Sequence, residues 1–120
     1  MSHDSVFNLD EALARVDHDR ETFDMMVELF LEHGPKDLAE AKAALDAQNA
    51  VGVARSSHRL KGAVLQFCAP AALDACKVLE ETAKAGNVAQ AEALYATLER
   101  ELLCLLNALR LERDKGLAAC

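Results

Sequence analysis

Apolar residues recur along this 120-residue chain at the spacing of an α-helix. The clearest stretch is residues 53–67, VARSSHRLKGAVLQF, in which apolar residues follow one another at intervals of seven, four and three. They are Val53, Leu60, Val64 and Phe67, with the small Ser57 in the intervening turn. Such intervals place side chains on one face of a helix with 3.6 residues per turn. The stretch therefore predicts a helix with one buried face.

The same period predicts further helices on both sides of this stretch. A short helix should begin at residue 9, and longer ones should cover residues 20–47, 50–67, 71–85 and about 87–113. Each predicted start follows a residue that can cap it, except the one after Pro70, which favours a first helical position. The capping residues are Asn8, Asp19, Asn49 and Asn87. Pro35, after Gly34, should bend or briefly break the second helix. Residues 1–7 should form a loose tail.

The last predicted helix is unusually rich in leucine. Its main stripe comprises Leu94, Leu98, Leu102, Leu105 and Leu109. Leu103, Leu106 and Leu111 widen this stripe beyond one face of a bundle. We expect a broad core-facing surface that also covers the short first helix. The alternative is a surface for a partner or for a second copy of the chain.

This layout predicts an all-α fold, an up-down four-helix bundle with a short extra N-terminal helix, in one domain spanning residues 1–120. The composition agrees, because 52% of residues are hydrophobic while only 4% are aromatic and two are proline. No Gly-rich phosphate loop is present, so kinase activity of its own is not expected. No Glu lies three residues before a His, so the sequence predicts no di-iron type metal site.

Charge narrows the range of partners. The formal net charge of −7 argues against nucleic-acid binding, which needs a basic surface. Between Asp46 and Asp74 there is no acidic residue, whereas Arg55, Arg59 and Lys61 all lie there. The sequence therefore predicts a cationic surface, suited to a phosphate or an acidic partner, on an otherwise acidic protein.

The chain shows neither a signal-peptide pattern nor an apolar run of about 18 residues, so we expect a cytoplasmic protein that does not enter a membrane. Four cysteines lack Cys-x-x-Cys spacing. We expect Cys68, Cys76 and Cys104 to be buried reduced thiols and Cys120 to be an exposed thiol.

His58 lies on the side of the central helix opposite its buried stripe, together with Arg55, Lys61, Gly62 and Leu65. A lone exposed histidine is usually an ordinary solvated residue. Here the flanking cations could attract phosphoryl oxygens, and the glycine, which costs roughly 1 kcal/mol in a helix, would leave room for their carrier. An exposed neutral imidazole has a free lone pair, so these residues predict a nucleophile.

At these positions the chain resembles a known family. The run His58-Arg59-Leu60-Lys61-Gly62 matches the His-x-x-Lys-Gly signature of histidine-containing phosphotransfer (HPt) domains. The similarity extends over about residues 7–111 and includes Phe67, Leu73, Cys76, Leu79, Glu80 and the turn at 85–87. The resemblance implies that His58 carries a phosphoryl group on its outer ring nitrogen. Lys61 and Arg55 would offset its charge, and Gly62, Arg59 and Leu65 would meet the partner.

The family resemblance also implies the partners, namely receiver domains of response regulators or of hybrid histidine kinases. The receiver would supply magnesium, so this chain would need no cofactor, and we expect it to be a monomer. Four positions depart from the family pattern: Leu65 and Val64 are bulky, Cys68 replaces a common glycine, and Gly52 replaces a helix former. Two alternatives remain, a helical module that binds a kinase or receiver without accepting phosphate, and a structural homodimer built on the last helix.

Overall fold

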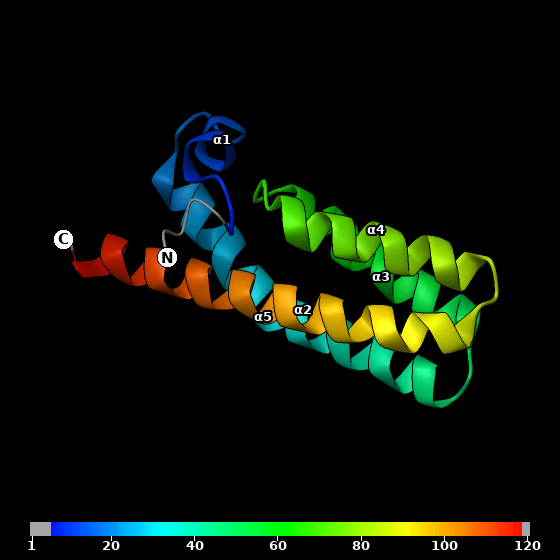
Figure 1. Cartoon of the computed structure of the whole chain (residues 1–120). Coiled ribbons are helices and arrows are strands. Elements are labelled where there is room, and N and C mark those ends of the chain that lie inside the picture. The colour runs from blue at the N-terminus through cyan, green and yellow to red at the C-terminus, as the bar shows by residue number, and fades with distance from the viewer. Residues whose placement is uncertain (1–5, 119–120) are drawn as a thin grey trace.

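The computed structural model describes residues 6–118, with side chains up to residue 115. Five helices follow in order: α1 (Leu9–Ala14), α2 (Arg20–Asp46), α3 (Ala50–Leu65), α4 (Pro70–Lys84) and α5 (Val88–Ala118). Figure 1 shows α2 to α5 running alternately up and down, with α1 at the end where α2 begins and α5 ends. Each long helix packs on the next, and α5 closes the bundle on α2. The predicted four-helix bundle with a short extra helix is confirmed.

The predicted helix starts are also confirmed, because their signals are local. The side chains of all four predicted caps accept a backbone N–H from the first turn of their helices: Asn8, Asp19, Asn49 and Asn87. At α3, Asn49 Oδ1 accepts from Gly52 N at 3.0 Å. Pro70 occupies the first turn of α4, where its missing N–H costs nothing.

The predicted break at Pro35 does not occur, because α2 is one helix of 27 residues. Buried Phe30 and Leu38 lie on either side of the proline and bind the helix to the bundle. Gly34 is also buried, and a Cβ there would meet the Phe30 ring at 3.3 Å. Tertiary packing therefore keeps α2 continuous through a residue that weakens an isolated helix.

The α3–α4 turn corrects two predictions. Helix α3 ends at Leu65, two residues earlier than predicted, and Cys68 then adopts φ +55°. Phe7, predicted to lie in a loose tail, is only 1% exposed, and the next residue, Asn8, donates its N–H to Cys68 O at 3.0 Å. The tail prediction is wrong at Phe7, and its first five residues lie outside the described part of the chain.

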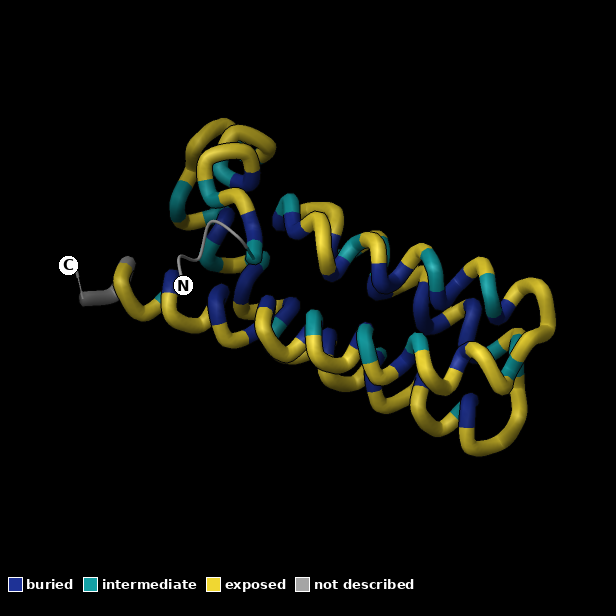
Figure 2. Tube along the Cα trace, viewed as in Figure 1, coloured by how far each residue is buried: buried dark blue, intermediate teal, exposed yellow. Residues whose placement is uncertain are grey.

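The core runs along the inner faces of the long helices (Figure 2). At one end, Phe67 contacts Phe23 and Phe30, with ring centroids 6.1 and 5.2 Å apart. The wide leucine surface predicted on α5 is only partly core. Leu106 is buried, whereas Leu103 and Leu111 are 55% and 44% exposed.

The cysteine prediction holds for one residue. Cys76 is buried, Cys68 is half-buried and Cys104 is exposed, all as free thiols. Cys104 belongs to the outer side of α5, and Cys68 lies in the turn after α3, so helical periodicity alone placed both too deep. Cys120 lies outside the described residues. Among residues 6–118, no helix is long and apolar enough to cross a membrane.

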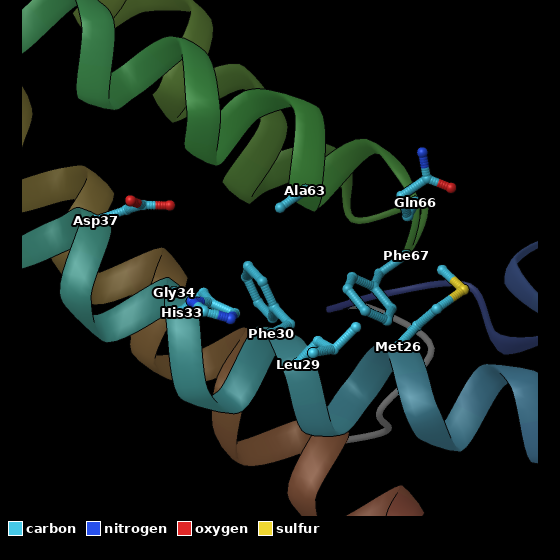
Figure 3. A pocket seen from close by; sticks show the side chains of 9 residues that line it. All are labelled: Met26, Leu29, Phe30, His33, Gly34, Asp37, Ala63, Gln66 and Phe67. Carbon is cyan, nitrogen blue, oxygen red and sulfur yellow. The ribbon is translucent and has the colours of Figure 1, made fainter.

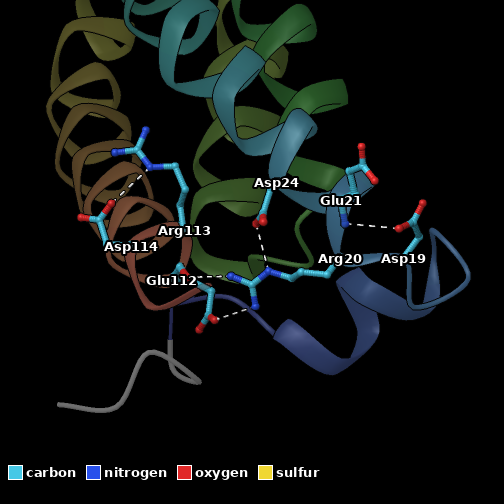
Figure 4. Close-up of polar contacts among 7 residues, drawn as sticks. All are labelled: Asp19, Arg20, Glu21, Asp24, Glu112, Arg113 and Asp114. Atoms are coloured by element: carbon cyan, nitrogen blue, oxygen red, sulfur yellow. Dashed lines mark hydrogen bonds and ion pairs between the residues drawn. The ribbon is translucent and has the colours of Figure 1, made fainter. Parts of the chain in front are cut away.

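An ion-pair cluster joins the start of α2 to the last turns of α5 (Figure 4). The Arg20 guanidinium donates to Asp24 Oδ1 at 2.9 Å, to Glu112 Oε2 at 3.1 Å and to the Glu112 carbonyl at 2.7 Å. Glu112 is buried, so Arg20 satisfies a charge that solvent reaches poorly.

Candidate functional site

Helix α3 presents His58 to solvent because its other face is fixed in the core. Val53, Leu60 and Val64 are fully buried, as predicted. Ser57 is buried as well, and its hydroxyl donates to the Val53 carbonyl at 2.8 Å, which satisfies the one polar group on that stripe. The His58 side chain points the other way and is 66% exposed.

A buried carboxylate from α4 contacts the inner nitrogen of this imidazole. Glu80 Oε2 lies 3.0 Å from His58 Nδ1, and the Glu80 side chain is only 4% exposed. Glu80 occupies the inner stripe of α4 with Cys76, Leu79 and Ala83, where an apolar residue would be usual. This contact therefore has the geometry of an orienting acceptor beneath the ring.

Two lysines share the same carboxylate. Lys61 Nζ donates to Glu80 Oε1 at 2.7 Å, and Lys84 Nζ donates to Oε2 at 3.1 Å. The hydrogen bond from Lys61 lowers the pKa of Glu80 most, opposed by burial and helped by Lys84 and His58, to about 2. Glu80 is therefore an anion at neutral pH, and we call Glu80, His58, Lys61 and Lys84 the Glu80 cluster.

An ionised Glu80 decides which ring nitrogen carries the proton. A carboxylate only accepts hydrogen bonds, so a neutral His58 bonded to it must donate from Nδ1. The lone pair is then on Nε2, the nitrogen on the far side of the ring from Glu80. The arrangement offers an oriented nucleophile at the exposed surface of α3.

The remaining predicted residues surround this exposed nitrogen in different ways. A Cβ built on Gly62 would meet no atom within 4 Å, so the space above it is open. Arg55 is exposed and lines a hollow of about 400 Å³ between α3 and α4. The other residues lining this hollow are Val51, Ala54, His58, Arg59, Glu80 and Lys84.

Arg59 contacts the neighbouring helix. Its Nε lies 3.3 Å from Asp37 Oδ1, and its guanidinium also pairs with Glu40, both on α2. Arg59 therefore joins α2 to α3 through two carboxylates. The Arg59 side chain is 45% exposed, so a partner could still reach it. Its contact with a partner stays a prediction.

Exposed apolar side chains flank His58 along α3. Val51 and Leu65 lie seven residues before and after it, a spacing that puts all three on one line of the helix surface. They are 67% and 44% exposed. Leu65 was among the residues predicted to meet the partner, whereas Val51 was not, although it has the same seven-residue spacing from His58.

An apolar groove of about 220 Å³ lies between α2 and α3, beyond the C-terminal side of His58 (Figure 3). Phe30 from α2 and Phe67 from the turn after α3 line it with their rings close together. Leu29, on its rim, is 55% exposed. Leu65 does not line this α2–α3 groove but a second hollow, which lies between the turn after α3 and the residues of α1.

Glu80 and Lys84 were missing from the predicted site. Glu80 had a sequence signal, because it is the one charged residue among the core-facing positions of α4. Lys84 follows it by one helical turn, the spacing of an ion pair. The surface around His58 was predicted to lack acidic residues. It is cationic, but the buried carboxylate of Glu80 lies beneath its lysines. Within the described residues no cluster of metal-ligating side chains occurs.

Comparisons with known proteins agree with this geometry. The model of the Hpt domain family matches residues 25–111. The crystal structure of histidine-containing phosphotransfer protein B from Pseudomonas aeruginosa PAO1 matches with a TM-score of 0.81 and 27% identity, covering 88% of this chain and 93% of that one. The HPT domain of a sensor hybrid histidine kinase from Shewanella shares the fold, with a TM-score of 0.81, 21% identity and coverage of 91% and 94%. A comparison with curated proteins found no match. The family match covers most of the chain, which therefore belongs to the Hpt domain family.

Proposed function

We propose that this protein relays a phosphoryl group between His58 and an aspartate of a receiver domain. The observation that carries the proposal is the contact of ionised Glu80 with His58 Nδ1, which leaves Nε2 as an exposed nucleophile. Family membership supports a histidine phosphotransfer role in a phosphorelay. The identity of His58 as carrier and of the receiver as partner is our inference.

The transfer step follows from the position of the lone pair. Nε2 attacks the phosphorus of an aspartyl phosphate, the bond from phosphorus to the acyl oxygen breaks, and its electron pair leaves with the aspartate carboxylate. A bond from Nε2 to phosphorus forms while the ring keeps its Nδ1 proton and gains positive charge. Glu80 lies where this charge develops, so it acts as a fixed counter-charge. The reverse step returns the group to an aspartate.

Lys61 would act mainly through Glu80. Its ammonium donates to the buried carboxylate at 2.7 Å, so it keeps Glu80 ionised beneath the ring. Arg55 is exposed on the open side and would attract the phosphoryl oxygens directly. Each contribution should be graded rather than essential, because solvent screens exposed charges.

The surface around His58 suits a receiver in shape and chemistry. Gly62 leaves open space beside the imidazole, which the receiver aspartate needs in order to approach. Val51, Leu65 and the α2–α3 groove supply apolar surface on both sides. We propose that these residues form the docking face, in the cytoplasm, and that the chain itself needs neither a cofactor nor kinase activity.

Transfer from a phosphorylated receiver tests the proposal. Wild-type protein and a His18→Asn control, altered in an exposed turn with positive φ, should gain acid-labile, alkali-stable phosphate. His58→Gln should gain none while keeping its helical content. Binding of the receiver without labelling of the wild type would instead favour the non-catalytic helical module. Label remaining on folded His58→Gln would refute the assignment of the carrier.

A further inference from the structure

The two lysines of the Glu80 cluster are held differently. Lys61 has Glu80 Oε1 at 2.7 Å, and its side chain is 31% exposed. Lys84 shares Oε2 with His58 Nδ1 at the longer distance of 3.1 Å, and its side chain is 65% exposed. Lys61 is also the stronger cause of the low pKa of Glu80. Lys61 is therefore the main counter-ion of the buried carboxylate, and Lys84 is a secondary one.

Releasing the two lysines has unequal consequences. If Lys61 moved away, the buried carboxylate would lose its shortest hydrogen bond, which is costly for a charge removed from water. If Lys84 moved away, Glu80 would keep both Lys61 and His58. An exposed lysine paired one helical turn away contributes little to stability. Lys84 is thus the member of the cluster that can change partners.

Lys84 is also close to the reacting ring. Its Nζ and His58 Nδ1 contact the same oxygen, so the two nitrogens lie within two hydrogen-bond lengths of each other. Both side chains open into the hollow between α3 and α4, which Arg55 lines as well. A phosphoryl group on Nε2 would therefore lie within reach of a flexible, exposed ammonium.

We propose that Lys84 is a phosphoryl-binding residue that leaves Glu80 Oε2 for the phosphoryl oxygens when His58 is phosphorylated. This inference rests on the proposed function and extends it to a residue outside the His-x-x-Lys-Gly run. The exchange suits both sites. The new dianionic group gains a cation, and Oε2 is left to accept from the positively charged ring alone.

A small donor, phosphoramidate, tests this without a contribution from docking. Lys84→Gln should be labelled on His58 about three- to fivefold more slowly than wild type at low salt, and Lys84→Arg should restore most of the rate. Lys42→Gln is the matched control, because Lys42 is also an exposed lysine paired one turn away, with Asp46. The difference should shrink at 1 M salt.

NMR of the lysine ammonium groups supplies a readout that a merely structural role would not change. Labelling should shift the Lys84 Nζ signal more than the Lys61 signal. The inference is overturned if Lys84→Gln labels at the rate of Lys42→Gln, or if Lys61 alone shifts. If wild-type His58 accepts no phosphate from either phosphoramidate or a receiver, the proposed function itself fails, and this inference fails with it.

Discussion

At the scale of single residues, the site depends on a carboxylate in a position that packing alone would give to an apolar side chain. Glu80 is 3% exposed, yet each of its oxygens has at least one cationic or imidazole partner. Such a group costs stability unless its partners are complete. On the inner face of α4, the contact of this carboxylate with His58 Nδ1 gives it a role that packing does not.

The low pKa of Glu80 makes a prediction about acid stability. A carboxyl whose pKa falls from 4.5 in the unfolded chain to about 2 in the fold stabilises the protein fully above pH 4.5. This contribution is lost as pH falls toward 2. Chemical unfolding of wild type and Glu80→Gln across pH 2–7 should show a constant difference in free energy above pH 5 that shrinks on acidification. A difference independent of pH would contradict the assigned ion pairs.

At the scale of elements, the sequence signals that predict α3 are strong and local, although the helix contains the unfavourable residue Gly62. Asn49 fixes the start of the helix, because its side chain accepts the N–H of Gly52, three residues later. Apolar residues at helical intervals fix its inner face. Both signals lie within one stretch of sequence, so the helix and the exposure of His58 could be predicted. The pairing of His58 with Glu80 could not, because it depends on the register between α3 and α4. The same limit explains Phe7, whose burial requires the distant α3–α4 turn.

Gly62 should affect docking and helix stability in opposite directions. Gly62→Ala should raise the free energy of unfolding by up to about 1 kcal/mol, because the added Cβ enters open space. Gly62→Gln should fold equally well but slow transfer from a receiver, with labelling by phosphoramidate unchanged. Thermal unfolding and the two labelling assays separate these effects. Normal transfer from the receiver to Gly62→Gln would show that the glycine does not provide clearance.

At the scale of the whole molecule, the bundle holds α2, α3 and α4 in the register that the site needs. Pro35 illustrates why sequence alone was insufficient, since core contacts on both sides of it preserve α2 as one helix. The Arg20 cluster joins α2 to α5 at the end of the bundle where α2 begins and α5 ends (Figure 4). Leu103 and Leu111 are exposed on α5, so a homodimer built on this helix stays a prediction. Analytical ultracentrifugation, which measures the mass in solution, would test it.

Removing the Arg20 cluster should weaken the fold without changing the chemistry. Arg20→Ala leaves the buried carboxylate of Glu112 without its cationic partner, so we expect a loss of about 1–3 kcal/mol. Arg100→Ala, which removes an exposed pair with Glu101, should change stability by less than about 0.5 kcal/mol. Urea unfolding measures both. Equal stabilities of the two variants would show that the Arg20 cluster does not stabilise the contact between α2 and α5.

The central claim is that Glu80 holds His58 by Nδ1 and thereby directs phosphate to Nε2. Heteronuclear NMR of the phosphorylated, ¹⁵N-labelled protein reads this directly, through the coupling of phosphorus to the ring nitrogens. We predict that phosphorus is bonded to Nε2 of His58, with Nδ1 still protonated and hydrogen-bonded to Glu80. Phosphorus on Nδ1, or on any residue other than His58, would contradict the account.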